Sequence, residues 1–303
     1  MTALLLFLAT ISLLFEATTQ TAIASGPTPT PLPPASQHRQ WSPDAPQRAR
    51  NANGVLRVPS DYPTITQALS DAQAGDTVRV AGGSYLEGAL AVPPGVHLVG
   101  DGWRNTIIDG GGADVVVYLG PGSLVEGFTI QGSGDGYFNA GVWISRGEAI
   151  IRKNHIRDNA TGFWAWCFDP ASCAVQATIE RNVISGNAFN GINSNDQPRL
   201  IIRRNTIVEN NAAGVILNNA ASLAKNNLIV ANAGEGLVNH AGASAGYNNV
   251  WGNAQDVVGV APGPGNLSLD PLFRNAAQGD YRLRAASPVI GMAEHQSPLH
   301  FLR

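Results

Sequence analysis

The nine-residue segment IRKNHIRDN at residues 151–159 recurs with variations along the chain, and this recurrence decides the fold. The later copies are IERNVISGN (179–187), IRRNTIVEN (202–210), AKNNLIVAN (224–232) and YNNVWGN (247–253). The first asparagines of these units, Asn154, Asn182, Asn205, Asn227 and Asn249, are 28, 23, 22 and 22 residues apart. A nearly constant period of about 22 residues is typical of a solenoid, in which each repeat forms one coil.

Two kinds of solenoid have repeats of this length, leucine-rich repeats and three-stranded parallel β-helices. The repeats here alternate single apolar residues with polar ones, and they carry glycine and asparagine where a leucine-rich repeat needs leucine. The pattern therefore predicts an all-β chain folded as a three-stranded parallel β-helix. We expect the repeated asparagines to adopt the left-handed backbone conformation at the bends and to hydrogen-bond from coil to coil, so they are assigned no chemistry.

The N-terminal half fits the same fold less regularly. An amphipathic pattern over residues 65–74, ended by Gly75, predicts a short helix that closes the open end of the stack. Strand-like runs separated by glycine-rich turns then predict the first coils, at residues 77–81, 96–99, 106–108, 115–119 and 124–130.

The extreme N-terminus has the features of an export signal. An apolar core, ALLLFLATISLLF (3–15), is followed by the small residues Ala22 and Ala24, which predicts a signal peptide over residues 1–24. An uncleaved anchor is the alternative, because no Lys or Arg precedes the apolar run. Residues 25–54 are rich in proline and predict an extended linker. We expect the mature protein to be secreted, periplasmic or at the cell surface.

Composition excludes other classes of function. The chain has 303 residues, of which 19 are Lys or Arg and 22 are Asp or Glu, giving a formal net charge of -3. Such a balance provides no basic field for a nucleic-acid backbone. No second long apolar run occurs, so we expect no membrane span in the mature chain, which we expect to be a monomer.

Both cysteines, Cys167 and Cys173, lie in one short segment of a chain expected to be exported. A local disulfide is the favoured interpretation in an oxidising compartment. A catalytic thiol would need a base, and a metal site would need two further ligands; neither is evident. No cofactor is expected, and a calcium ion is supported by no motif.

Several segments resemble one superfamily. The stretches YPTITQAL (62–69), GDTVRV (75–80) and GSYLE (83–87), together with the repeats, look like the right-handed parallel β-helix proteins of the pectin lyase-like superfamily over residues 55–290. The ending GNLSLDPLF (265–273) is similar to the tail of bacterial secreted members. The resemblance implies a right-handed β-helix over residues 55–253 and a C-terminal capping segment and tail over 254–303. It does not choose among lyases, hydrolases, esterases, epimerases and inactive proteins.

Most catalytic motifs of that superfamily are missing. The esterase Gln-Asp and Asp-Phe segments, the paired carboxylates of polygalacturonases and the calcium segment of pectate lyases are not found. Phe168-Asp169-Pro170 is similar to the start of an epimerase segment, but Ala171 stands where histidine would be.

Strand alternation predicts where a site would lie. The residues directly after Gly141, Gly162, Gly191, Gly214 and Gly236 are expected to point inward, so that the next residues point outward. This register brings Trp143, Trp164, Trp166, Asn193 and Asn195 to one outer patch. Indole faces suit sugar rings, so the patch is predicted to bind a glycan. The alternatives are that the Cys167–Cys173 loop covers the indoles, or that a register slip turns the patch into core.

Ionisable residues near this patch are the candidates for catalysis. For elimination or epimerisation at a uronic acid, a base removes a proton while a cation neutralises the carboxylate. We assign the catalytic roles to Asp169, Asp196 and Arg199, and further substrate contacts to Asp135 and Arg146. His155 follows a repeat asparagine and is expected to be a surface residue.

Two hypotheses follow. In the first, the protein is exported and binds an extracellular polysaccharide, on which it acts as a uronate lyase or epimerase if it is an enzyme. In the second, it is a non-catalytic structural or surface β-helix. Exposed indoles beside a carboxylate and an arginine would favour the first hypothesis, whereas buried indoles would favour the second.

Overall fold

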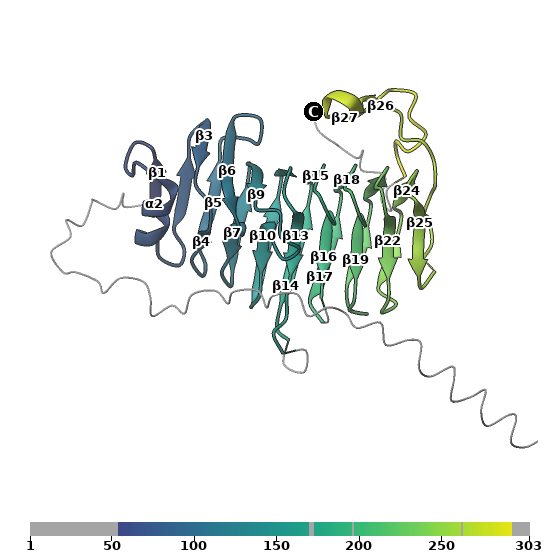
Figure 1. Ribbon diagram of the computed structural model, residues 1–303, viewed down its shortest axis with the longest axis horizontal. Coiled ribbons are helices and arrows are strands. Elements are labelled where there is room, and N and C mark those ends of the chain that lie inside the picture. The colour runs from purple at the N-terminus through teal and green to yellow at the C-terminus, as the bar shows by residue number, and fades with distance from the viewer. Residues whose placement is uncertain (1–53, 170–172, 196, 262, 293–303) are drawn as a thin grey trace, which may run out of the picture. The chain divides into compact units, whose positions relative to one another are not determined.

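The computed structural model describes residues 54–169, 173–195, 197–261 and 263–292, so the predicted signal peptide, most of the linker and the tail after Met292 lie outside it. Over the described residues the chain forms coils stacked along one axis, with three parallel sheets running the length of the stack (Figure 1). The prediction of an all-β, three-stranded parallel β-helix is confirmed. No helix among these residues is long and apolar enough to cross a membrane.

Each coil contributes one strand to each sheet in turn. Sheet A consists of β1 (Val55–Val58), β2 (Thr77–Val80), β5 (His97–Gly100), β8 (Ser123–Glu126), β11 (Glu148–Arg152), β14 (Gln176–Glu180), β17 (Arg199–Arg203), β20 (Leu223–Lys225) and β23 (Ser244–Gly246). Sheet B consists of β3 (Gly83–Leu86), β6 (Thr106–Ala113), β9 (Thr129–Ser133), β12 (His155–Arg157), β15 (Val183–Ser185), β18 (Thr206–Val208), β21 (Leu228–Val230) and β24 (Asn249–Trp251).

Sheet C forms the third side of the coil. Its strands are β4 (Leu90–Val92), β7 (Val115–Leu119), β10 (Ala140–Ile144), β13 (Thr161–Ala165), β16 (Ile192–Ser194), β19 (Val215–Leu217), β22 (Glu235–Asn239) and β25 (Gln255–Gly259). β25 follows residue 253, where the sequence placed the end of the β-helix; that boundary stays a prediction.

The core is a stack of equivalent apolar side chains. In sheet B, Ile156, Ile184, Ile207 and Ile229 pair in register and are fully buried. Because parallel strands place equivalent residues side by side, each repeat covers the apolar face of the one before it.

Two asparagine ladders join the coils. In the first, Asn205 donates from its backbone N to Asn227 Oδ1 at 3.0 Å and from Nδ2 to the same oxygen at 3.0 Å. The same pair of bonds recurs from Asn154 to Asn266, and a second ladder runs from Asn159 to Asp256. The predicted coil-to-coil bonding is confirmed.

Two details of the ladder prediction are wrong. The left-handed residue is the one before the ladder asparagine: Lys153, Arg181 and Arg204 have φ between 53° and 58°. The asparagine itself is then free to aim both its backbone N–H and its amide along the stack. The ladder also continues through Asn248, not Asn249, because Asn248 Oδ1 accepts from Asn227 N at 3.0 Å.

A short helix, α2 (Ile65–Asp71), lies at the N-terminal end of the stack (Figure 1). Thr64 Oγ1 accepts from Gln67 N at 3.2 Å, and Ile65, Ala68 and Leu69 are buried. The predicted capping helix is present but ends three residues before Ala74. The Asp76 carboxylate accepts from Gln73 N at 2.8 Å, which turns the chain toward sheet A.

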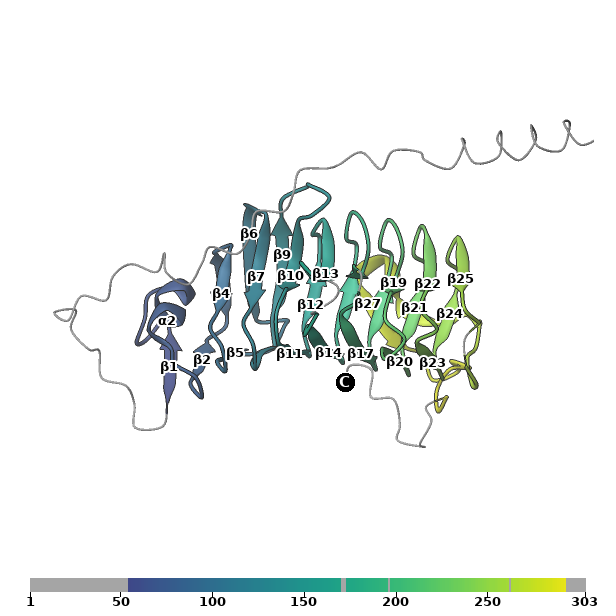
Figure 2. The same cartoon turned by 90° about the horizontal axis from the view of Figure 1, so that it is seen from below.

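The C-terminal segment folds back over the outside of the stack. β26 (Phe273–Asn275), the 3-10 helix η3 (Ala276–Gln278) and β27 (Asp280–Leu283) form an antiparallel hairpin, which we call the C-terminal hairpin. It packs on the outer face of sheet B, as two views at right angles show (Figures 1 and 2). Tyr281 of the hairpin and Val289, which follows the hairpin, form one apolar cluster with Val183, Val208 and Val230.

Candidate functional site

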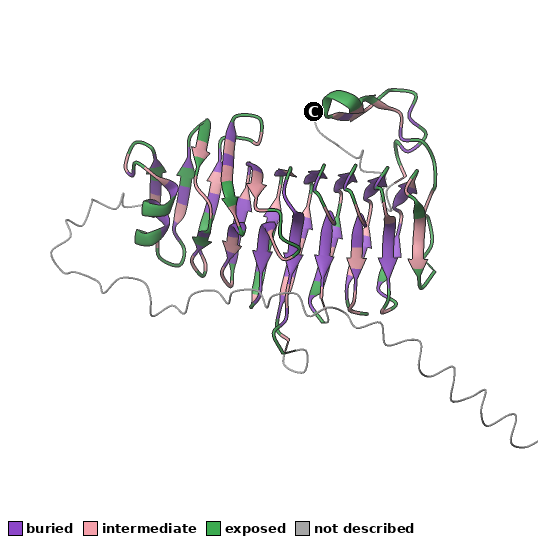
Figure 3. Ribbon diagram, in the orientation of Figure 1, coloured by how far each residue is buried: buried purple, intermediate pink, exposed green. Residues whose placement is uncertain are grey.

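The outer face of sheet C carries the tryptophans as predicted from strand alternation. Val142 and Phe163 point into the main core, whereas Trp143 and Trp164 belong to a separate cluster and pair with each other in register. No register slip has occurred. The expected platform is nevertheless not exposed: Trp143 and Trp164 are 4% and 1% exposed, and Trp166 is half-buried. Figure 3 shows that burial is nearly continuous along the middle strands of sheet C.

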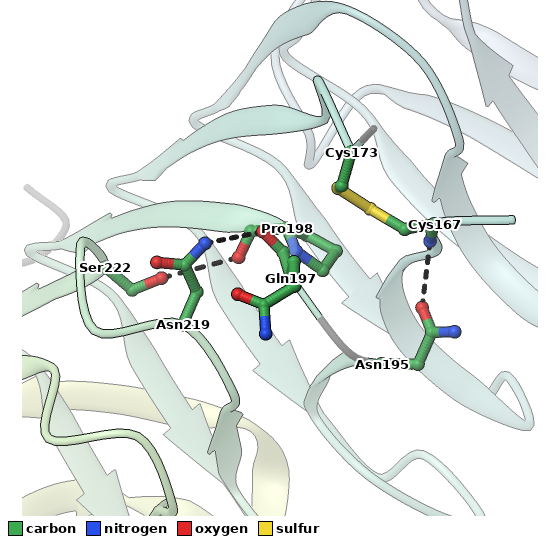
Figure 4. Close-up of a disulfide and its surroundings, with 7 residues drawn as sticks. All are labelled: Cys167, Cys173, Asn195, Gln197, Pro198, Asn219 and Ser222. Carbon is green, nitrogen blue, oxygen red and sulfur yellow. Dashed lines mark hydrogen bonds between the residues drawn. A yellow bond between two sulfur atoms is a disulfide. The ribbon is translucent and has the colours of Figure 1, made fainter. Parts of the chain in front are cut away.

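The described cover over Trp164 comes from a segment other than the Cys167–Cys173 loop. Phe138, in the loop between β9 and β10, stacks on Trp164 with ring centroids 5.5 Å apart, and Tyr137 meets the same indole edge-on at 5.4 Å. The Cys167–Cys173 disulfide is present (Figure 4). From the described part of its loop, the ring of Phe168 packs against Trp166, with ring centroids 6.4 Å apart.

The predicted polar partners are scattered. Asn193 is buried on the outer face next to Trp164. Asn195 Oδ1 accepts from Cys167 N at 3.0 Å and fixes the start of the disulfide loop (Figure 4). Asp135 and Arg146 are exposed.

The expected catalytic residues are not shown together. Asp169 is exposed, and Asp196 lies outside the described residues. Arg199 begins β17 in sheet A, where its Nη1 donates to Gln176 Oε1 at 3.0 Å. In the described part of the chain no group of three His, Cys, Asp or Glu side chains is placed to hold a metal ion.

A different concave region lies over sheet B. A groove of about 750 Å³ opens between the outer face of this sheet and the C-terminal hairpin. Its walls come from the turn before β6, from β9, β12 and β15, and from the hairpin. The lining residues are Trp103, Arg104, Ile107, Thr129, His155, Arg157, Asp158, Ser185, Gly186, Glu209, Ala276, Ala277, Gln278, Gly279, Asp280, Tyr281 and Arg282.

The sequence of the outward positions explains why the groove forms here. Where the hairpin packs, the outward residues of sheet B are apolar, as with Val183, Val208 and Val230. In β12 the equivalent positions are His155, which pairs with Val183, and Arg157, which pairs with Ser185. Because polar side chains give the hairpin nothing apolar to bury, its apolar contacts stop at β15, and a groove remains between the hairpin and Trp103.

An indole and a guanidinium form one wall of the groove. Trp103 is half-buried, and the guanidinium carbon of Arg104 lies 4.1 Å from its ring centroid. Arg104 has no carboxylate partner among the described residues. Arg157 and Arg282, in contrast, form ion pairs with Asp158 at 2.8 Å and Asp280 at 2.6 Å. Arg104 is thus the cation of the groove that is available to a ligand.

The floor holds a neutral histidine. His155 is 9% exposed, and its ring stands edge-on to Trp103 at 5.1 Å. Burial, reinforced by the positive charges of Arg157 and Arg104, lowers the pKa of His155 to about 4. His155 Nε2 is 2.8 Å from Ser185 Oγ. The expectation that His155 is a surface residue is wrong, because the outer face of sheet B is partly covered.

The opposite wall is tied to the stack by Tyr281. Its hydroxyl donates to Glu209 Oε2 at 2.8 Å, across 72 positions of sequence. Burial, followed by the hydrogen bond to Glu209, raises the pKa of Tyr281, so this phenol is a proton donor.

The groove residues were missed at the sequence level, although one signal was present. In the repeats, the residue after the first asparagine and the residue after the second isoleucine face outward in sheet B. They are polar in the 151–159 unit but mostly apolar in the later units. An apolar outward position requires a cover, so this change marks the edge of the covering segment.

Comparison with known proteins concerns the fold. The profile of the family described as right handed beta helix region matches residues 95–254. No curated protein matches the chain. An α-1,3-glucanase catalytic domain solved with tetrasaccharides is 14% identical, with a TM-score of 0.48 over 70% of this chain and 40% of that chain. This chain therefore spans less than half of that glucanase chain.

Two further solved structures are similar at the same level. A pectin methylesterase solved with a hexasaccharide is 12% identical, with a TM-score of 0.41 over 62% of this chain and 67% of that chain. The A-module of a mannuronan C-5 epimerase from Azotobacter vinelandii is 14% identical, with a TM-score of 0.37 over 74% of this chain and 98% of that chain.

Proposed function

The chain belongs to the right-handed β-helix family, and from this premise we propose that it is an exported protein that binds an extracellular polysaccharide in the groove over sheet B. One observation carries the proposal. The outward positions of sheet B change from apolar to polar where the C-terminal hairpin ends, and this leaves a groove of about 750 Å³ walled by Trp103 and Arg104. That volume is in the range of ligand sites.

The chemistry of the lining suits a sugar chain. The half-buried Trp103 offers an apolar face for the CH groups of a sugar ring. The hydroxyl groups of the sugar would form hydrogen bonds with the side chains of Ser185, Gln278 and Arg104, which line the groove around Trp103. Three acidic and three arginine side chains line the groove, so its formal charges balance and it does not favour a strongly charged ligand. Arg104, which pairs with no carboxylate among the described residues, is the group that would bind the carboxylate of a single uronate.

The binding proposal is tested by titration calorimetry of the purified protein with neutral and acidic polysaccharides. We expect Trp103→Ala to weaken binding at least about tenfold, as loss of a stacking ring does. Tyr85→Ala, which removes an aromatic ring from β3 outside the groove, is the matched control and should leave the affinity unchanged. Binding that survives Trp103→Ala, or that is lost in Tyr85→Ala, would place the site elsewhere.

We extend the proposal to the reaction a uronate would undergo, elimination or epimerisation. Arg104 would pair with the carboxylate of the sugar, and Glu209 Oε2 would accept the proton removed from C5. In elimination Tyr281 Oη would donate a proton to the departing glycosidic oxygen as the C4–O4 bond breaks, and in epimerisation it would donate a proton to the opposite face of C5. Ultraviolet absorbance of the unsaturated product, and NMR of the epimer content, test this step. Activity on polyuronates that disappears in Glu209→Gln supports it, whereas binding with neither signal leaves a binding protein.

Burial of the sheet C indoles favours a second candidate, a non-catalytic structural β-helix. Trp143 and Trp164 stabilise the outside of the stack instead of lining an open surface. This candidate predicts no saturable binding of any polysaccharide in the titrations above.

Export rests on the disulfide and on the N-terminal apolar segment. A disulfide between Cys167 and Cys173 is typical of oxidising compartments. Mass spectrometry of the protein recovered outside the cytoplasm should find an N-terminus close to Ala24. An intact N-terminus would indicate the anchored form.

A further inference from the structure

The aromatic cluster on sheet C has features that a purely structural cluster would not need. Three indoles lie on adjacent coils, with Trp143 and Trp166 stacked at 5.9 Å and an angle of 20°. Beyond Trp166 the row continues to Phe168, which is 56% exposed. The result is a row of flat rings that runs from a covered interior to open solvent.

The covered part of this row holds polar groups without partners. Trp164 is 1% exposed, yet its Nε1 has no hydrogen-bond partner among the described residues. The same is true of Ser145 Oγ, in the residue directly after β10. Because burying an unpaired donor costs free energy, indole N–H groups in finished cores are usually hydrogen-bonded. The cover over Trp164 therefore excludes solvent without replacing the hydrogen bonds that solvent provides.

The cover itself is held mainly by two rings. It is the loop at residues 134–139, between β9 and β10, and its backbone is anchored where Gly134 N donates to Ala113 O at 2.7 Å and where Asn139 O accepts from Thr161 N at 3.1 Å. Between these anchors, Tyr137 and Phe138 make the contacts with the indoles. Tyr137 is 55% exposed, so one of the two rings is only partly packed.

We propose that residues 134–139 are a displaceable cover over a second carbohydrate site, which takes an uncharged sugar ring. When the cover moves aside, the faces of Trp143 and Trp164 join those of Trp166 and Phe168 in one platform. The ring CH groups of a neutral hexose stack on the indoles, and its hydroxyl oxygens accept from Trp164 Nε1 and Ser145 Oγ. Among the described residues this cluster contains no charged side chain, so a carboxylate would lose its hydration there without compensation.

This site is independent of the groove over sheet B, since it lies on another sheet and shares no residue with it. Its affinity is set by how often the cover is open, because a site that is open for a fraction of the time binds more weakly by that fraction. Weakening the cover must therefore strengthen binding. A structural cluster predicts the opposite, since loosening its packing only destabilises the protein.

The test is titration of the full chain with neutral gluco-oligosaccharides, with acidic oligouronates as the second probe. We expect Phe138→Ala to increase the affinity for the neutral probe about fivefold to tenfold. Adding Trp164→Ala to that variant should abolish the gain. Phe273→Ala, in the C-terminal hairpin, is the matched control for loss of a phenylalanine ring and should not change this affinity.

The outcomes decide the proposal whatever happens at the groove. Trp103→Ala must leave binding at sheet C unchanged, so failure of the groove proposal does not affect this test. Unchanged or lost affinity in folded Phe138→Ala, checked by circular dichroism, overturns the proposal, as does preference for the acidic probe. If Phe138→Ala does not fold, Phe138→Leu keeps the apolar contact, removes the ring stacking, and must show the same direction of change.

Discussion

Sheets B and C present two outer faces of one coil stack, and each is covered by a segment of different origin. On sheet C the cover is local: Tyr137 and Phe138 belong to the loop that directly precedes β10. On sheet B the cover is distant, since Tyr281 bonds to Glu209 over 72 residues. The local cover closes over all of Trp164, whereas the distant cover stops at β15 and leaves a groove.

The difference teaches where a solenoid of this kind can form a site. The inward residues repeat because each coil buries the apolar face of the one before it, so they do not distinguish one coil from another. Outward residues are free to vary, and an apolar outward residue is stable only under a cover. Sites are then expected where covers end or can move: the groove lies at the edge of the C-terminal hairpin, and the proposed sheet C site lies beneath the loop at residues 134–139.

Breaking a ladder between sheets B and C should have the largest effect, because it removes the frame of both faces. Asn210 is fully buried and bonds to Asn187 above it and Asn232 below it. We expect Asn210→Ala to lower the free energy of unfolding by about 4 kcal/mol in urea titrations, since several buried groups lose partners. The exposed neighbour variant, Asn211→Ala, should change it by less than about 0.5 kcal/mol. Equal effects of the two variants would contradict the structural role of the ladder.

Removing the distant cover should affect sheet B and spare sheet C. Tyr281 is 5% exposed in the hairpin cluster. We expect Tyr281→Ala to destabilise the docked hairpin by about 3 kcal/mol, measured by hydrogen exchange of residues 273–292. Tyr281→Phe keeps the ring, removes the hydroxyl that bonds to Glu209, and should cost about 1 kcal/mol. Faster exchange at Trp164 in either variant would show that the two covers are coupled.

Acid should destabilise the groove face more than the sheet C face. His155 has its pKa lowered to about 4, from an unfolded value of about 6.5, so the unfolded chain binds the proton first as the pH falls. The stability present at neutral pH is therefore lost between about pH 6.5 and pH 4, by about 3 kcal/mol from this residue. His155→Gln should flatten that part of the pH profile of unfolding. A profile identical to that of the wild type would contradict the burial of a neutral imidazole.

Sheet A, which no described segment covers in this way, should give the smallest effect and serves as the reference for the comparison. Arg203 Nε lies 2.8 Å from Glu180 Oε2, and the arginine side chain is 49% exposed. Because solvent screens such a pair, we expect Arg203→Gln to change the free energy of unfolding by less than about 0.5 kcal/mol in the same urea titrations. A loss above about 1 kcal/mol would contradict this difference between the outer faces.

Much of the fold was predictable, for reasons visible in single residues. Ile156 and Ile184 are equivalent in the repeat, and they pair in the structure, because parallel coils force equivalent positions together. Alternation placed Val142 inward and Trp143 outward. The ladder position at Asn248 was missed because the 22-residue period points to Asn249, whereas the constant five-residue spacing between the two asparagines of each unit, counted back from Asn253, points to Asn248.

The candidate sites were predictable only in part. Alternation showed that Trp164 faces outward but not that Phe138 lies on it, because a loop conformation is not periodic. The groove over sheet B needs Tyr281, which sequence spacing does not connect with His155 or Glu209. The signal that remained was the change from polar to apolar outward positions, which indicates a cover without saying which segment provides it.

The sequence by itself determined the coil, its three sheets, the asparagine ladders and the inward or outward direction of each strand residue. All of these are local or repeated features, so periodicity is enough to specify them. Only the tertiary structure decided which outward residues are accessible, because exposure depends on segments that fold back from elsewhere in the chain. Trp164 and His155 illustrate this: both face out of the coil, but Phe138 packs on Trp164, and the ring of Trp103, from the turn before β6, stands edge-on to His155.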